Sequence, residues 1–347
     1  MNEFIPRQAP YAESPVPGIM ISNFDLFSLL ADGKFHSGEE LGSKFSISRS
    51  AVWKKIKTLQ KLGVDIHCVK GKGYRVGYPV ELLDRGKILS LLDKDIMPLP
   101  GGLEIHTIID STNQYLLDHI NDPAFHRCVA LAEYQTAGRG RRGNRWVSPF
   151  AAGITMSIAW HFDVPPEPVA GISLGAGVAI MRLLQKLGIR NAGLKWPNDI
   201  YIAGRKLGGS LVEIQAESEG PFNTVIGIGI NYSFPVIGNN IEQPWIDIAE
   251  ILQPLPSRNL IVAGLISEMF RLFTWAEQNG FSDIIEEWRR HDCMQGKVAA
   301  LLLPGRRLHG LVLGIDNAGA LLMSVNDKTQ KFSSGEISLK AVADVPA

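Results

Sequence analysis

The hydrophobic period changes along this chain of 347 residues, and this limits the folds that it can form. Apolar residues recur at helical spacing in the segment 49–62, at Val52, Ile56, Leu59 and Leu62. The segment 153–160 (GITMSIAW) instead alternates like a strand, and helical patterns return at 172–188 and 260–280. From about residue 296 only strand-like runs remain. The chain is therefore expected to be α+β and, from its length, to hold two or more domains.

We predict four parts from these changes. A proline-rich extension at 1–20 is expected to be disordered or loosely docked. A winged helix-turn-helix domain is expected at 21–78 and a central α+β domain with a mixed sheet at 79–293. A small β-barrel is expected at 294–347.

The N-terminal module is strongly basic, although the whole chain has a formal net charge of zero. Residues 44–75 hold nine Lys or Arg and one acidic residue, Asp65, so the rest of the chain must sum to −8. Ser37 and Glu40 have the spacing of a capping box, Ser48 precedes a second helix, and a basic hairpin follows around 70–73. This order is typical of a winged helix that binds DNA. A basic protein–protein module is the alternative.

The candidate DNA-binding residues lie on the second of these helices, before it and in the hairpin. They are Gly38, Ser48, Arg49, Ser50, Trp53, Lys54, Lys57, Lys70 and Lys72.

Composition excludes several classes of protein. Three widely spaced cysteines without a CxxC pair indicate free thiols, with neither a disulfide framework nor a zinc site. The first 18 residues hold four prolines and no apolar core of a signal peptide. No apolar run is long enough to cross a membrane. We expect a cytoplasmic protein with no membrane partner.

The segment GRGRRGNRW at 138–146 concentrates glycine and arginine after a strand-like run. It formally satisfies GxGxxG, but the following NRWVSPFAAG has no helical period, so the dinucleotide-binding interpretation fails. A P-loop motif is also missing from the sequence. The segment is best interpreted as a loop whose N–H groups and arginines bind an anion, with Trp146 stacking on an aromatic base. A surface loop is the alternative.

Three other segments support a ligand site. In LKWPND, Lys195 ends a strand-like run before a turn that Pro197 fixes. In GIGIN (227–231), two glycines lie on one face of a strand, so a group is expected to approach that face closely. In DSTNQ, Ser111 and Gln114 have capping-box spacing, and a helix N-terminus accepts polar ligands.

Together these motifs resemble the bifunctional biotin–protein ligase and biotin-operon repressor family of bacteria, over nearly the whole chain after residue 20. The motifs that carry the resemblance are FHSGEELG, SRSAVWKKI, GKGY, DSTNQYLL, AEYQTAGRGRRG, KWPND, RKLGG, GIGIN and GEISL. The resemblance implies a ligase catalytic domain at 79–293 and an SH3-like barrel after it.

The resemblance also implies an activity. ATP and biotin form biotinyl-5′-AMP and pyrophosphate, with Mg²⁺ accompanying ATP. Biotin then passes to a lysine of the biotin carboxyl carrier protein of acetyl-CoA carboxylase. With biotinyl-5′-AMP as corepressor, a homodimer is expected to bind operator DNA.

The family's motifs imply a role for individual residues. Biotin-binding residues are Ser111, Thr112, Asn113, Gln135, Arg139, Gly140, Arg141 and Lys195. The adenylate-binding residues are Arg139, Arg141, Arg142, Trp146, Asn198 and Asn231. Lys195 and Arg141 are the expected catalytic residues, because fixed cations offset the charge that builds on phosphoryl oxygens.

Two positions depart from the family's usual pattern. Asn144 stands where a basic residue is usual, and Ser210 replaces a branched aliphatic residue. Three alternatives remain: a lipoate–protein ligase, a ligase without a DNA-binding role, and a ligand-sensing transcription factor with an inactive catalytic body.

Overall fold

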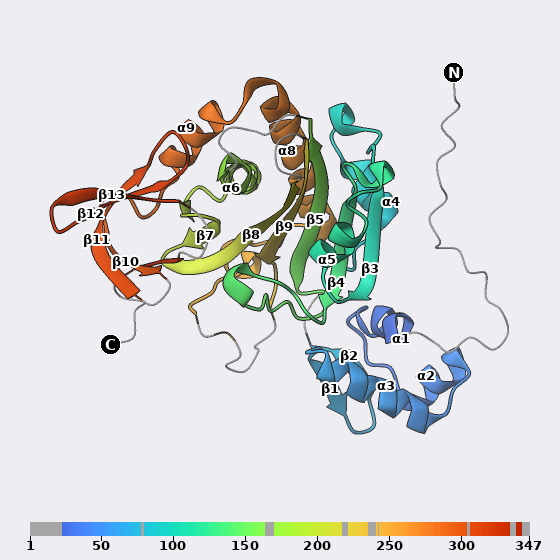
Figure 1. The fold of residues 1–347 in the computed structure, drawn as a ribbon. Helices are drawn as coiled ribbons and strands as arrows, with labels where there is room; N and C mark the ends of the chain where they lie inside the picture. The colour runs from blue at the N-terminus through green and yellow to red at the C-terminus, as the bar shows by residue number, and fades with distance from the viewer. Residues whose placement is uncertain are drawn as a thin grey trace, which may run out of the picture. The chain divides into compact units, whose positions relative to one another are not determined.

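The computed structural model describes residues 23–77, 80–163, 170–216, 221–234, 241, 243–303, 306–333 and 338–341 (Figure 1). The chain forms two compact units, Met1–Pro79 and Val80–Ala347. The extension predicted at 1–20 and part of the GEISL motif lie outside the described residues. The predicted boundary after residue 293 stays a prediction.

The described part of the first unit contains three helices and a hairpin. They are α1 (Asn23–Leu30), α2 (Gly38–Phe45), α3 (Arg49–Lys61), β1 (Ile66–Val69) and β2 (Gly73–Val76). The capping box of Ser37 and Glu40 is complete, and the Ser48 side chain accepts from the Ala51 N–H, so both predicted helix starts are confirmed. The apolar stripe of α3 is buried at Val52, Ile56 and Leu59.

The second unit is built around a seven-stranded mixed sheet in the order β3-β4-β5-β9-β8-β7-β6. The strands are β3 (Leu103–Ile109), β4 (Val129–Gln135), β5 (Gly153–Phe162), β6 (Ala192–Lys195), β7 (Asp199–Ile202), β8 (Arg205–Ala216) and β9 (Phe222–Asn231). Strands β3 and β4 pair in parallel, and the other neighbours pair antiparallel. The predicted mixed sheet is confirmed.

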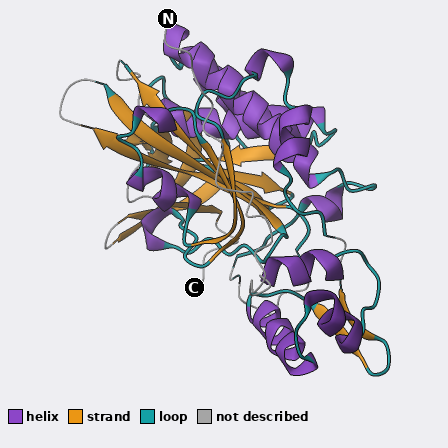
Figure 2. Ribbon diagram, turned by 90° about the vertical axis from the view of Figure 1, so that its right-hand side faces the viewer, coloured by secondary structure: helices purple, strands orange, loops and turns teal. Residues whose placement is uncertain are grey.

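Helices cover the two faces of this sheet unequally (Figure 2). Met156, Ile158 and Trp160 of β5 enter the main core with helices α6 and α8, whereas Ala159 packs in a smaller cluster with α5. Since neighbouring strand residues point to opposite faces, α5 lies across the sheet from α6 and α8.

The helices are α4 (Arg85–Leu91), α5 (Thr112–Asp118), α6 (Ala170–Lys186), α7 (Ile248–Ile251), α8 (Arg258–Asn279) and α9 (Ser282–Arg290), with 3-10 turns η1 (Lys94–Ile96), η2 (Pro123–Phe125) and η3 (Arg141–Gly143).

The C-terminal strands form a small antiparallel sheet in the order β13-β12-β11-β10-β14, which confirms the predicted all-β end of the chain. They are β10 (Val298–Leu303), β11 (Arg306–Ile315), β12 (Leu321–Val325), β13 (Lys328–Phe332) and β14 (Ser338–Ala341). The Trp196 Nε1–H donates to the Gly319 carbonyl at 3.1 Å, so this sheet contacts the turn that follows Lys195.

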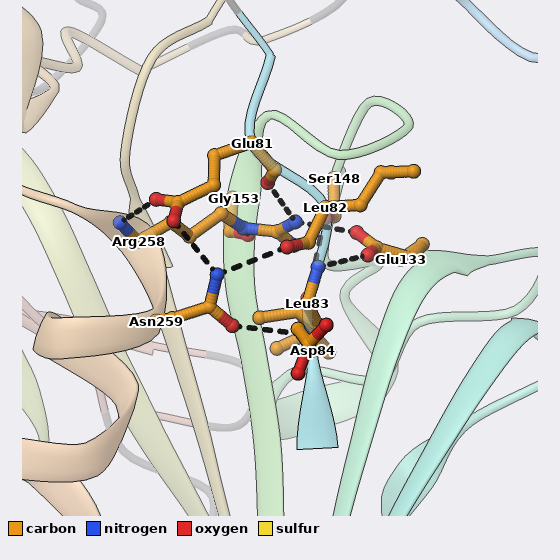
Figure 3. Close-up of polar contacts among 10 residues, drawn as sticks. Glu81, Leu82, Leu83, Asp84, Glu133, Ser148, Gly153, Arg258 and Asn259 are labelled. Atoms are coloured by element: carbon orange, nitrogen blue, oxygen red, sulfur yellow. Dashed lines mark hydrogen bonds and ion pairs between the residues drawn. The ribbon is translucent and has the colours of Figure 1, made fainter. Parts of the chain in front are cut away.

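A buried ion pair ties the start of the second unit to its sheet (Figure 3). The Arg258 guanidinium contacts the Glu133 carboxylate, and both side chains are almost fully buried. Arg258 also donates to the Gly153 carbonyl at 2.9 Å, and Glu133 accepts the Leu83 N–H at 2.6 Å. The pair therefore joins α8, β4, the start of β5 and the segment that follows residue 80. We call these contacts the Arg258–Glu133 clamp.

A second set of hydrogen bonds holds the same segment. The Asn259 amide donates to the Glu81 carboxylate at 2.9 Å and to the Leu82 carbonyl at 3.0 Å (Figure 3). Its oxygen accepts the Asp84 N–H at 2.8 Å. Residues 81–84 are thus fixed by α8 before α4 begins.

We expect Glu133→Gln to lower the free energy of unfolding by about 3 kcal/mol, because it leaves the Arg258 cation buried without its counter-ion. Urea denaturation measures this loss. Glu277→Gln is the control, since the Arg127–Glu277 pair is partly exposed at 23% and 26% and should contribute less than about 1 kcal/mol. Equal losses in the two variants would contradict a special role for the buried pair.

Candidate active site

One row of residues crosses five neighbouring strands of the large sheet. In register these are Lys195, Asp199, Gly209, Gly229 and Thr155. Residues directly opposite one another on antiparallel strands point to the same face. Gly227, two residues before Gly229, shares that face. We call Gly209, Gly227 and Gly229 the glycine floor.

Two side chains lie directly on this floor, as the sequence predicted for the GIGIN strand. A Cβ atom on Gly227 would overlap the Asn113 amide, and one on Gly229 would overlap the Trp146 ring. Only glycine lets these side chains approach the sheet so closely. The α5 face of the sheet therefore carries Asn113 and Trp146 side by side.

Buried amide and hydroxyl groups gather beyond Gly227, where α5 begins. The Thr112 main-chain N–H and hydroxyl both donate to Gln135 Oε1, at 2.8 Å and 3.1 Å. The Ser157 hydroxyl lies 2.7 Å from Thr112 Oγ1 and 2.5 Å from Asn113 Oδ1. We call Ser111, Thr112, Asn113, Gln135 and Ser157 the amide end; each is less than 7% exposed. It offers both donors and acceptors to a polar, uncharged group.

Only one of the two hydrogen bonds of the capping box predicted at Ser111 and Gln114 is present. The Ser111 hydroxyl accepts the Gln114 N–H at 3.4 Å. The Gln114 side chain turns away and donates to Asp118 at 2.7 Å. Its oxygen accepts from Arg139 at 2.6 Å, so the side chain binds the glycine-rich loop instead of capping the helix.

The other end of the row is cationic. Lys195 is only 7% exposed, and its ammonium donates to the Tyr201 hydroxyl at 3.0 Å. Lys206 pairs with Asp199 at 2.7 Å and lies 5.8 Å from the centre of the Trp146 ring. A Lys195 cation held in a nearly buried site is suited to an anionic ligand.

Arg141 reaches this cationic end from the glycine-rich loop. Its Nη1 lies 3.4 Å from Asn198 Oδ1, and the Asn198 amide in turn donates to the Ser210 carbonyl. Burial lowers the pKa of Arg141; Asp199 opposes this shift and the charge of Arg142 adds to it. The desolvated guanidinium is therefore stabilised when an anion arrives.

The loop itself is a tight hairpin. Trp146 N–H donates to the Gly138 carbonyl at 3.0 Å, and Gly140 N–H donates to the Asn144 carbonyl at 2.8 Å. Arg142 sits at the tip with a left-handed φ of 59° and is exposed. Asn144, the departure noted in the sequence, thus helps to close the hairpin through its main chain.

The structure places one predicted site residue, Asn231, and one departure from the family's pattern, Ser210, as follows. The Asn231 amide donates to the carbonyls of Lys206 and Ile246, at 3.2 Å and 3.0 Å, so its N–H groups hold the chain after β9. Ser210 lies opposite Ile228, a core residue, on the face away from the glycine floor. Its main-chain N–H and carbonyl bond Asn198, so the backbone at this position contacts the site although the side chain does not line the floor.

Sequence reasoning missed Ser157, Asp199, Tyr201, Lys206 and Glu213. All except Ser157 lie within ten residues of a motif that was recognised. Alternation from Gly209 through Leu211 places Glu213 on the floor side of β8, and this period-2 signal was available from the sequence.

The predicted DNA-binding residues lie in the first unit. Arg49, Ser50, Trp53, Lys54 and Lys57 are exposed along α3, and Lys70 and Lys72 are exposed in the hairpin. Ser48 is the exposed N-cap of α3. Gly38 is instead buried, and a Cβ there would lie 3.3 Å from Arg49 Cγ. Gly38 therefore lets α2 pack under Arg49.

The described residues hold neither a metal-binding cluster nor a membrane-spanning helix. They contain no group of three or more His, Cys, Asp or Glu side chains placed to hold a metal ion. None of their helices has the length and apolar character needed to cross a bilayer. Cys68, Cys128 and Cys293 are free thiols.

Family models match three parts of the chain. The Biotin/lipoate A/B protein ligase family matches residues 105–231, an HTH domain matches 23–75, and a Biotin protein ligase C terminal domain matches 297–340. The fold is similar to that of a biotin protein ligase from Aquifex aeolicus solved in complex with biotin and ATP. That match has a TM-score of 0.59 at 22% identity and covers 69% of this chain and 99% of the other. Fold and site thus define a protein ligase of the biotin/lipoate class joined to a helix-turn-helix domain.

The chain belongs to the family of bifunctional ligase/repressors called BirA. It is 40% identical to the member from Salmonella typhimurium over 91% of this chain and 97% of the relative. It is 39% identical to the Escherichia coli member, over 91% and 96%, and 32% identical to the Bacillus subtilis member, over 91% and 97%. The resemblance stated from the motifs is confirmed, and the protein is a biotin–protein ligase with a repressor's DNA-binding domain.

We expect Gly227→Ala to weaken biotin binding at least tenfold, because the new methyl group displaces Asn113 from the floor. Isothermal titration with biotin measures the affinity. Gly86→Ala is the matched control, since a Cβ there meets only Asp84 Oδ1 at 3.3 Å. An unchanged affinity in Gly227→Ala would show that biotin does not use this face.

Proposed function

We propose that the glycine floor holds biotin and then biotinyl-5′-AMP in one orientation. The ureido ring, which has both N–H donors and a carbonyl acceptor, fits the amide end at Ser111, Thr112, Asn113 and Gln135. The biotin carboxylate and the α-phosphate fit the cationic end at Lys195 and Arg141. The observation that carries this proposal is that both ends share one face of the sheet, with three glycines between them.

The chemistry follows from these positions. A biotin carboxylate oxygen attacks the α-phosphorus of ATP, a new C–O–P linkage forms, and pyrophosphate leaves. Two anions approach each other in this step, so Lys195 and Arg141 lower its barrier by offsetting charge on the phosphoryl oxygens. No protein nucleophile is needed. In the second step a lysine amine attacks the acyl carbon and AMP leaves.

The nucleotide is assigned to the region around Trp146, Asn198 and the exposed Arg142, with Trp146 stacking on adenine. Asn231 shapes this region by holding the segment around Ile246. Gly140 and Arg139 belong to the loop that closes over the adenylate. Asp199, which pairs with Lys206, is the carboxylate at this end that would help to hold Mg²⁺ brought in with the ATP phosphates, and the ion would supply charge neutralisation there.

The remaining partners are part of the same proposal. The acceptor is the biotin carboxyl carrier protein of acetyl-CoA carboxylase, and the reaction takes place in the cytoplasm. Bound biotinyl-5′-AMP favours a homodimer, so that two helix-turn-helix domains bind the two halves of a palindromic operator.

Pyrophosphate release tests the ligase assignment against the lipoate alternative. We expect release with ATP and biotin but not with ATP and lipoate, and one biotinyl-5′-AMP retained per chain by native mass spectrometry. Equal release with both acids would favour the lipoate–protein ligase. No release with either would favour the ligand-sensing transcription factor.

We expect Lys195→Ala to slow pyrophosphate release by about 100-fold, the effect of removing one fixed donor from a site that stabilises developing charge. Its circular dichroism spectrum should stay unchanged. Lys186→Ala is the control, because that lysine is 60% exposed on α6 and pairs with Glu268. Normal release by Lys195→Ala would refute its catalytic role.

For DNA binding we expect Lys54→Ala and Lys57→Ala each to weaken binding on all sequences and to reduce the slope of log affinity against log salt by about 1. Fluorescence anisotropy with labelled duplexes at several salt concentrations measures the slope. Lys94→Ala, an exposed lysine in η1, should leave it unchanged. Unchanged slopes in the α3 variants would favour a ligase without a DNA-binding role.

A further inference from the structure

The first arginine of the glycine-rich loop does not point to the cationic end. Arg139 Nη2 lies 2.5 Å from Glu213 Oε1 on β8, and Arg139 Nη1 donates to Gln114 Oε1 on α5 at 2.6 Å. A single guanidinium thus ties the loop to a strand and to a helix.

Glu213 also joins this contact to the amide end. Its second carboxylate oxygen accepts from the Asn113 amide at 2.9 Å. Asn113 itself lies on Gly227 of the floor. We call Arg139, Glu213 and Asn113 the latch.

The latch lies far from the reacting groups. Glu213 follows Gly209 by four residues on β8, and Gly209 is in the row of Lys195. At roughly 3.4 Å per residue this separation is about 14 Å along the strand. The Arg139 charge is therefore held near the amide end of the floor, where the Glu213 carboxylate already neutralises it.

We propose that Glu213 is a positioning residue of the ligase, which acts through Arg139 and Asn113 to keep the glycine-rich loop closed over the biotin ring. This inference rests on the proposed function, and it revises the expectation from the family's motifs that Arg139 itself binds biotin and the adenylate. The latch slows the escape of biotin and of biotinyl-5′-AMP. Arg141 and Lys195 offset the charge that builds on the phosphoryl oxygens.

A charge exchange tests the latch. Arg139→Glu and Glu213→Gln should each raise the KM for biotin about five- to tenfold and speed loss of biotinyl-5′-AMP equally, with kcat for pyrophosphate release within twofold. Arg139→Glu combined with Glu213→Arg should recover most of the biotin KM and of the adenylate retention, because the ion pair is restored with its charges reversed.

The opposite results overturn the latch. If Arg139 contacts the ligand's anion, the double variant stays at least as impaired as Arg139→Glu, because a carboxylate then faces a phosphate. A fall in kcat at unchanged KM in Glu213→Gln, or no effect at all, also contradicts the proposal. Glu277→Gln controls for loss of a partly exposed ion pair away from the site and should match the wild type. Failure of the unmodified protein to release pyrophosphate with biotin would instead refute the proposed function.

Discussion

The buried contact between Arg258 and Glu133 is the interaction on which the rest of the second unit depends. The free energy needed to bury two charges is about as large as their attraction, so the intact pair adds little net stability. Its main effect is to fix the positions of the elements that it joins. Glu133 is two residues from Gln135 at the end of β4, and Arg258 holds the carbonyl of Gly153 where β5 begins. The same pair fixes Leu83, close to the point where the second unit starts. One clamp thus sets the ends of two central strands and the entry of the chain into the ligase body.

The active site follows from how unequally the two faces of the sheet are used. Helices α6 and α8 bury one face in the main core, and the short α5 covers only part of the other. On that second face the glycines let Asn113 and Trp146 lie close against the strands, with neutral polar groups at one end and cations at the other. A ligand with a polar ring and an anionic tail fits in one orientation only, with the ring at the amide end and the tail at the cationic end.

Local signals in the sequence predicted local structure well. The complete capping box at Ser37 and the close approach to the GIGIN glycines both depend on residues near one another or on a single strand. The contacts of Glu213 did not follow from local spacing, because its partners Arg139 and Asn113 are 74 and 100 residues away in the chain. Ser210 departs from the family's usual residue, and only the strand register places its side chain on the face away from the glycine floor. Strand register and long-range pairing are set by the whole fold, so a motif alone does not specify them.

A crystal structure with a non-hydrolysable analogue of biotinyl-5′-AMP tests the central claim most directly. The account predicts the ureido ring beside Asn113, within hydrogen-bond distance of the amide end, and the phosphate or its substitute beside Lys195 and Arg141. Arg139 should remain on Glu213. A ligand bound in the reverse direction, or on the face covered by α6, would contradict the account.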